Sequence, residues 1–343
     1  MPGSAEIHRV IAGLSPVFGM GLHWFYILLI IASVPLVLFI LYTAVVCYLF
    51  LPTIIRVFEE APMFVPPNEP PDPDAKNVRF QAADGRWLQG SWLRATCDQR
   101  QGTIVFCHEF LANRWSCRPY CEALRSSGYE IFTFDFRNHG ESETQPGYAP
   151  TQWASQFELL DLRAALAHVQ SHVDDATNWI ALLGVSRGGS SAVLAAAVEP
   201  CVRAVVTDGA FPTNLLQLAY MNRWAKIYIG DGLLYQLTPD WYHSLFCGVV
   251  RMIGARRRGC RFLRVARAIR RVSPRPLLMI HGAKDSYITP DVAEQLYRRA
   301  GEPKEFWLVP GAKHNQAIQV AGESYGQRVV KFFSLAKQRS SGG

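Results

Sequence analysis

The sequence predicts an α/β fold in which a mostly parallel sheet of eight strands carries helices on both faces. Short apolar runs of strand length alternate with longer segments of helical periodicity. The first two runs follow each other closely, as in a hairpin. From the third onward, a helical pattern separates each strand from the next, as parallel pairing requires. With 343 residues, 49% of them hydrophobic, the chain can bury one large core.

The order of the elements places an insertion late in the domain. The expected strands span residues 78–82, 87–93, 103–107, 130–134, 179–183, 204–207, 276–280 and 305–309. The expected helices span residues 114–127, 152–173, 187–198, 290–299 and 319–337. Residues 211–273 break the alternation with an aromatic-rich, helical pattern. We therefore expect a helical cap at about 211–273, inserted into a domain of residues 77–343.

The N-terminal part of the chain is set apart by its lack of charge. No Lys, Arg, Asp or Glu lies between Arg9 and Arg56, and residues 26–51 are almost purely apolar, which is long enough to span a bilayer. A buried core helix or a cleavable signal peptide fits this length less well, and no small-residue cleavage site follows. We expect an N-terminal segment (1–25), a transmembrane helix (26–51) kinked at Pro35, and a Pro-rich stalk (52–76).

Residues 181–189 have the pattern of a buried strand that runs into a G-x-S-x-G turn and then a helix. Such a turn lifts the hydroxyl of Ser186 out of the sheet edge, and Gly184 and Gly188 let the strand and helix approach closely. The pentapeptide alone is a weak signal, because Gly and Ser are common turn residues. Its interpretation as a nucleophile depends on a base and an acid elsewhere.

Two loops supply that base and acid at the same edge of the expected sheet. Asp285 follows the strand 276–280, and His314 follows the strand 305–309. The carboxyl ends of parallel strands meet at one edge, where open α/β sheets bind ligands. Ser186, Asp285 and His314 therefore form a candidate Ser-His-Asp triad, with Asp208 after the strand 204–207 as an alternative acid.

The same edge also supplies candidate donors to an oxyanion. The backbone N–H groups of Phe110, after the third strand, and of Arg187, after the nucleophile, are expected to form the oxyanion hole.

With these motifs in the required order, residues 77–335 resemble an α/β-hydrolase-superfamily serine hydrolase, of the serine-aminopeptidase-like or monoglyceride-lipase-like kind. The resemblance includes the segment Asp135-Phe136-Arg137-Asn138-His139-Gly140-Glu141-Ser142, similar to a D-x-R-G-x-G-x-S stretch that such proteins use structurally. It implies an α/β-hydrolase fold. One departure is Glu109 after His108, where most relatives have Gly. A carboxylate there would repel the oxyanion unless it pairs with a base such as Arg114 or Arg187; we expect it to point outward.

Residues 251–275 hold ten arginines and no acidic residue, so this segment accounts for the net charge of +7. Helical spacing over 256–271 puts most of the arginines on one half and apolar residues on the other, which predicts a basic amphipathic helix. Such a helix is either a solvated face over a packed stripe or a contact with anionic lipid headgroups. No nucleic-acid-binding motif accompanies the charge.

The sequence thus predicts a single-pass membrane-anchored serine hydrolase that cleaves an ester or thioester of a lipid or acyl substrate. Alternatives are a serine peptidase or amidase of the same fold, or a non-catalytic scaffold that binds a partner or lipid. The eight cysteines lack the spacing of metal ligands or a disulfide framework, and no metal or organic cofactor is implied. Their unpaired pattern and the basic segment favour a cytosolic catalytic domain. Nothing in the sequence predicts the oligomeric state.

Overall fold

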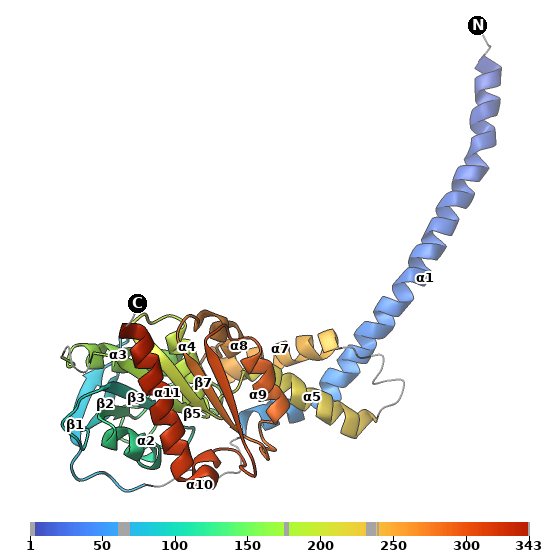
Figure 1. The fold of residues 1–343 in the computed structure, drawn as a ribbon. Helices are drawn as coiled ribbons and strands as arrows, with labels where there is room; N and C mark the ends of the chain where they lie inside the picture. The colour runs from blue at the N-terminus through green and yellow to red at the C-terminus, as the bar shows by residue number, and fades with distance from the viewer. Residues whose placement is uncertain (1–3, 61–68, 175–177, 231–237, 239, 342–343) are drawn as a thin grey trace. The chain divides into compact units, whose positions relative to one another are not determined.

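The computed structural model describes residues 4–60, 69–174, 178–230, 238 and 240–341 (Figure 1). By their contacts, the residues divide into two compact units, Met1–Val57 and Phe58–Gly343. In the first unit the described residues belong to the helix α1 (Ser4–Glu59). Its segment Trp24–Glu59 has a mean hydropathy of 2.7 in its most apolar window and is long enough to cross a membrane; none of that window is buried. By length and composition it is a candidate span.

Helix α1 continues beyond the expected end of the span. It passes through Pro52 and ends at Glu59, so the prediction of a stalk from residue 52 is wrong for residues 52–59. A proline inside a helix removes one helical N–H and crowds the carbonyl one turn earlier, but here α1 continues through Pro52. The dense prolines begin only after residue 60, and residues 61–68 of the expected stalk lie outside the described residues.

The second unit contains one sheet of eight strands, as predicted. The strands are β1 (Lys76–Gln81), β2 (Trp87–Leu93), β3 (Gly102–Cys107), β4 (Tyr129–Phe134), β5 (Ile180–Val185), β6 (Val202–Asp208), β7 (Leu277–Gly282) and β8 (Lys304–Val309). Their order in the sheet is β1-β2-β4-β3-β5-β6-β7-β8. The pairs β1–β2 and β2–β4 are antiparallel, and the other pairs are parallel. A short turn of residues 82–86 joins β1 to β2, as an antiparallel hairpin allows.

Helices cover both faces of this sheet, which Figure 1 shows with α2 and α11 in front. They are η1 (Arg114–Ser116), α2 (Cys117–Ser126), α3 (Gln156–Gln170), α4 (Arg187–Ala196), α9 (Pro290–Tyr297), α10 (Ala317–Ala321) and α11 (Glu323–Ser341). The helix expected over 319–337 is divided in two at Gly322, whose φ of +54° lies in the left-handed region.

The hydrophobic core has two layers because neighbouring residues of a strand point to opposite faces. In β3, Val105 and Cys107 join a cluster that includes residues of α3 and α4. Ile104 and Phe106 join the other cluster, which includes residues of α2 and α11. All four side chains are completely buried. The sheet is therefore a rigid support whose loops at the carboxyl edge of the strands are held from both sides.

The expected insertion lies between β6 and β7. Its described helices are α5 (Thr213–Ile229), α7 (Asp240–Arg257), α8 (Val265–Ala268) and η2 (Ile269–Arg271). Residues 231–237 and 239 of this segment lie outside the described residues.

The prediction of one basic helix over 256–271 is wrong. Helix α7 ends at Arg257, and Gly259 has a φ of +62°, which is left-handed. The chain then runs extended: Phe262 forms a β-bridge with Ser155, and helix resumes only at Val265. The prediction relied on the spacing of arginines and apolar residues, and this spacing does not show that Gly259 ends the helix.

Candidate active site

Ser186 lies on a strained turn between β5 and α4. Its φ of 52° and ψ of −114° are unusual for a residue with a side chain, and its backbone N–H donates to the carbonyl of Asp208 over 2.7 Å. A Cβ on Gly188 would overlap the backbone of Cys107, and one on Gly184 would lie 2.5 Å from the carbonyl oxygen of Gly188. Both positions therefore need glycine for the turn to form.

The three residues predicted as a triad meet at the carboxyl edge of the sheet. Ser186 Oγ lies 3.0 Å from His314 Nε2. His314 Nδ1 lies 2.7 Å from Asp285 Oδ2 on the other side of the ring. Since a carboxylate only accepts, Nδ1 carries the proton in this pair, which leaves Nε2 free to accept the Ser186 proton. In this geometry, Nε2 of the His314 imidazole can accept the proton of the Ser186 hydroxyl.

Asp285 is held by its own loop, which starts at the end of β7. Its Oδ1 accepts the backbone N–H groups of Tyr287 and Ile288 over 2.9 and 2.8 Å. His281 Nε2 donates to the carbonyl of Ile288 over 2.7 Å and lies 3.5 Å from Asp285 Oδ2. With its orientation set by these bonds, Asp285 can orient the His314 ring.

The two residues predicted to donate to an oxyanion, Phe110 and Arg187, lie in the turn after β3 and at the start of α4. Within the described part of the chain, no acceptor is found for the backbone N–H of either residue. Unpaired N–H groups at a helix start favour negative charge.

The side chain of Arg187 contacts Phe110, the residue of the other predicted donor. It is completely buried, and its guanidinium lies 5.1 Å from the centroid of the Phe110 ring. It donates to His139 Nε2 over 3.0 Å and lies 3.5 Å from a Glu158 carboxylate oxygen. Burial, followed by the charge of Arg187, holds the pKa of His139 well below its usual range, so the ring stays neutral and can accept this bond. Arg187 thus acts as an internal brace.

Known proteins resemble this chain along most of its length. The family described as alpha/beta hydrolase fold matches residues 102–247. YfhR of Salmonella typhi, an uncharacterized protein, is 30% identical over 303 residues, which cover 82% of this chain and 88% of that protein. The chain belongs to the α/β-hydrolase family.

Solved structures agree with this assignment at the level of the fold. The Pyrococcus furiosus esterase Pf2001 superposes with a TM-score of 0.58 at 22% identity and covers 80% of this chain and 98% of its own. The hypothetical protein PA2218 from Pseudomonas aeruginosa superposes with a TM-score of 0.54 at 20% identity, covering 81% and 99%. At these identities the likeness extends to the fold alone.

In this α/β hydrolase, Glu109 does not point outward as expected. Glu109 is completely buried. The Ser116 hydroxyl donates to its Oε2 over 3.0 Å, and its Oε1 has no partner among the described residues. Arg114 pairs instead with Asp135. Burial raises the pKa of Glu109, which favours a neutral carboxyl group at this position. The sequence analysis expected an exposed Glu109 side chain. That prediction was wrong because no pattern in the sequence indicates that the Ser116 hydroxyl is buried beside it.

Asp208, the alternative acid, lies at the end of β6 and is not the group bonded to His314 Nδ1. It is almost fully buried, and its Oδ2 has no partner among the residues the structure describes. Burial raises the pKa of Asp208 to about 7, and the nearby carboxyl groups of Glu109 and Asp285 add to the rise. This environment disfavours the charged form that would steady an imidazolium.

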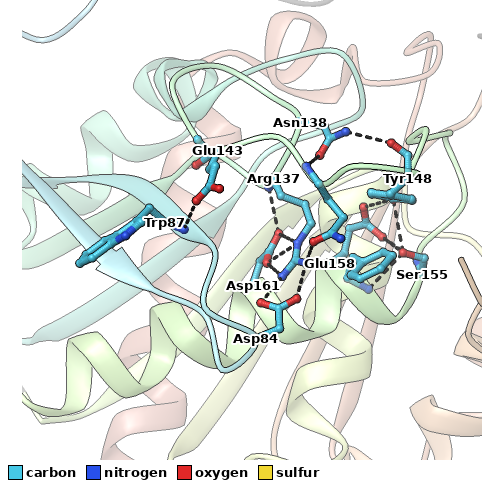
Figure 2. Close-up of polar contacts among 12 residues, drawn as sticks. Asp84, Trp87, Arg137, Asn138, Glu143, Tyr148, Ser155, Glu158 and Asp161 are labelled. Atoms are coloured by element: carbon cyan, nitrogen blue, oxygen red, sulfur yellow. Dashed lines mark hydrogen bonds and ion pairs between the residues drawn. The ribbon is translucent and has the colours of Figure 1, made fainter. Parts of the chain in front are cut away.

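The segment 135–142 supports the site structurally in this α/β hydrolase. Figure 2 shows Arg137 between Asp161 and Asp84; its guanidinium is completely buried, with bonds of 2.5 and 2.6 Å to these carboxylates. Asn138, at the first glycine position of the D-x-R-G-x-G-x-S pattern, has a φ of +62°, a conformation that Asn tolerates. Its amide donates to the carbonyl of Tyr148 over 3.0 Å.

His108 connects this segment to the turn after β3. Its Nδ1 donates to the carbonyl of Glu109 over 2.7 Å, and its Nε2 accepts the backbone N–H of Phe136 over 3.0 Å. Burial, followed by the charge of Arg187, lowers the pKa of His108 to about 3, so the ring is neutral as these bonds require. Among the described residues, no group of three or more His, Cys, Asp or Glu could hold a metal ion.

Proposed function

We propose that this α/β hydrolase is a serine hydrolase that cleaves an ester or thioester of a lipid or acyl substrate. The observation that carries the proposal is the continuous contact from Ser186 Oγ through His314 to Asp285, at 3.0 and 2.7 Å. A serine next to an oriented imidazole is the arrangement that acyl transfer needs.

The proposed mechanism has two halves. Ser186 Oγ attacks the carbonyl carbon while His314 Nε2 takes its proton, and the backbone N–H groups of Phe110 and Arg187 stabilise the oxyanion. The leaving alcohol or thiol departs with the proton from His314, which leaves an acyl group on Ser186. Water then attacks the acyl group with His314 again as the base, and Ser186 is regenerated with release of the acid. Asp285 orients His314 and stabilises its positive charge throughout.

Because the insertion is aromatic and the N-terminal helix is apolar, we infer that the substrate carries an acyl chain. Helix α5 contacts the acid loop directly, because the Tyr220 hydroxyl donates to the carbonyl of Tyr287. The Tyr287 ring in turn lies 5.4 Å from the His314 ring. An aromatic wall beside the nucleophile suits an apolar acyl group. A peptide or amide, cleaved by the same acyl-transfer chemistry, is the second candidate substrate.

A non-catalytic scaffold is the candidate from a different class, and the buried Glu109 favours it. If its carboxyl group were charged, it would oppose an oxyanion. Labelling with a fluorophosphonate separates the two functions. We expect wild type to be labelled and Ser186→Ala not to be. Wild-type protein that stays unlabelled favours the scaffold, and labelling that persists in Ser186→Ala removes Ser186 as the nucleophile.

We further propose that α1 anchors the protein as a single pass, with the span at 26–51 and the catalytic domain at 77–343 on the cytosolic side. The exposed apolar surface of α1 supports an anchor. Half-buried Cys97 lies in the proposed catalytic domain. A membrane-impermeant thiol reagent applied to intact cells should spare Cys97, and its modification there would reverse the proposed topology.

A further inference from the structure

A cavity of about 840 Å³ lies within residues 58–343, apart from the residues of the proposed triad. It is bounded by the start of α5, by one side of α7 and by the extended segment 259–264. Its lining includes four arginines and no acidic residue among those the structure describes. These arginines are Arg251, Arg256, Arg261 and Arg264.

The charge of these arginines is not neutralised by the surrounding protein. Arg251 donates to Gln217 Oε1, a neutral acceptor, over 2.7 Å. Arg256, Arg261 and Arg264 have exposed side chains and no ion-pair partner among the described residues. By contrast, Arg257 and Arg258, outside the lining, lie 3.9 and 3.8 Å from Glu59. A hollow with unpaired positive charge on several sides attracts anions.

Two features of α5 add directional donors to this charge. The 17-residue helix begins at Thr213 without a side-chain cap, so the positive end of its dipole and its first N–H groups are available. Thr213 lines the cavity and is only 3% exposed, and its hydroxyl has no partner in the described part of the chain. A buried hydroxyl without a partner costs free energy unless a ligand satisfies it.

Backbone pairing and ring packing hold the extended segment and α7, which form two walls of the cavity. Phe262 forms the β-bridge to Ser155, and its ring lies 5.4 Å, edge on, from that of Phe58. Phe58 also packs against Gly254 of α7, where a Cβ would lie 3.0 Å from its ring. Rigid walls reduce the ordering that binding would require.

We propose that this cavity binds a phosphate ester, with its phosphate held by the arginines and the start of α5. Arginine forks match phosphate oxygens in geometry and charge. The cavity is larger than a phosphate group and has apolar walls at Met252, Phe262 and Leu263, so it also accommodates an attached organic group. The ester is a lipid headgroup or a soluble compound. The site does not depend on the proposed hydrolase activity.

The test uses the full chain in an uncharged detergent and measures the midpoint of thermal unfolding. Added ligand raises this midpoint in proportion to its binding. The probes are inorganic phosphate, glycerol phosphate and short-chain phosphatidic acid, compared with sodium chloride at equal ionic strength and with short-chain phosphatidylcholine. We expect the phosphate monoesters to stabilise the protein more than chloride does. Tighter binding of phosphatidic acid than of glycerol phosphate assigns the site to a lipid headgroup, and equal binding assigns it to a soluble ester.

Matched variants locate the binding. The triple variant Arg256→Gln, Arg261→Gln and Arg264→Gln should weaken binding about tenfold or more. The control triple Arg267→Gln, Arg270→Gln and Arg271→Gln removes the same charge from exposed positions outside the lining, and should retain binding. Equal losses in both triples, or no stabilisation of wild type beyond that of chloride, would overturn the proposal.

Thr213→Val tests the directional part of the site without changing charge. It removes the buried hydroxyl at nearly constant shape, and should weaken binding several-fold without lowering the midpoint of the ligand-free protein. Unchanged binding would overturn the assignment of the phosphate to the start of α5. Turnover of a short-chain ester is followed in parallel and should be unaffected by either triple. Ser186→Ala should retain phosphate binding, so failure of the hydrolase proposal and failure of this one are distinguishable.

Discussion

The Ser116 hydroxyl donates a hydrogen bond over 3.0 Å to Oε2 of the buried Glu109, the residue that precedes the predicted oxyanion donor Phe110. This bond accounts for one oxygen of a buried carboxyl group whose other oxygen, Oε1, has no partner among the described residues. Because burial raises the pKa of Glu109, the group ionises at higher pH than an ordinary glutamate. In the proposed mechanism, the charge state of Glu109 would therefore make the stability of the oxyanion depend on pH.

Glu109→Gln should mimic the neutral form at every pH. We expect the ratio of wild-type kcat to Glu109→Gln kcat to fall as pH rises, since ionised Glu109 repels the oxyanion in wild type alone. The measurement is ester turnover across the neutral range. Glu141→Gln, which changes an exposed carboxylate bonded to Arg114, is the control and should give a constant ratio. A ratio for Glu109→Gln that does not vary with pH contradicts this role.

The two candidate acids should separate cleanly by activity. Asp285→Asn removes the acceptor at 2.7 Å from His314 Nδ1, and by analogy with other serine triads kcat should fall roughly 10⁴-fold. Asp208→Asn changes a carboxyl group that does not bond this nitrogen, and kcat should stay within about tenfold of wild type. Steady-state kinetics on one ester substrate distinguishes them. A larger loss for Asp208→Asn would transfer the role of the acid to Asp208.

Asp208 should instead affect stability. Burial raises its pKa from the ordinary 3.8 to about 7, so the folded state keeps a proton that the unfolded state releases. Its contribution to stability is therefore complete below about pH 4 and is lost as pH rises to about 7. In Asp208→Asn, the free energy of unfolding should vary less with pH between pH 4 and pH 7. At pH 8 the variant should be more stable than wild type by at most about 4 kcal/mol.

Thermal unfolding of the full chain in detergent at several pH values checks this profile. Asp291→Asn, at an exposed position of α9, is the control and should follow wild type. An Asp208→Asn profile parallel to wild type between pH 4 and pH 7 would show that Asp208 ionises at its ordinary pKa.

Much of the fold could be predicted from the sequence because its signals are periodic and local. Apolar runs identified every strand, and the strand order then brought Ser186, Asp285 and His314 to one edge. The errors lie where individual contacts and turns, rather than a periodic pattern, decide the outcome. Whether Glu109 is buried depends on Ser116, and the end of α7 depends on Gly259 and on pairing of the next residues with the segment before α3. No period in the sequence encodes such contacts.

Gly188 should be intolerant of any side chain for steric reasons alone. A Cβ there would overlap the carbonyl oxygen of Cys107 at the end of β3. Gly188→Ala should destabilise the protein by about 1–3 kcal/mol and reduce fluorophosphonate labelling, because the backbone must shift beside Ser186, the proposed nucleophile. Gly248→Ala is the matched control in α7, where the nearest atom is 3.8 Å from the added Cβ, and should stabilise by about 0.5–1 kcal/mol. Equal effects of the two changes would rule out the steric explanation.

The buried ion pair of Arg137 should be required for stability, more so at high pH. Arg137 Nη2 lies 2.5 Å from Asp161, and both side chains are completely buried. Burial raises the pKa of Asp161 to about 6, against the opposing effect of Arg137. Arg137→Met leaves the carboxyl group without its counter-charge, and should cost about 3–5 kcal/mol where Asp161 is ionised.

The pH dependence separates this electrostatic cost from simple loss of packing. Without Arg137, Asp161 can stay protonated, so the loss of stability in Arg137→Met should be smaller at pH 5 than at pH 8. Adding Asp161→Asn to Arg137→Met removes the uncompensated charge and should restore part of the stability at pH 8. Thermal unfolding of the single and double variants at both pH values checks this. A loss that is the same at both pH values, and that Asp161→Asn does not relieve, would assign the role of Arg137 to packing against its neighbours rather than to its charge.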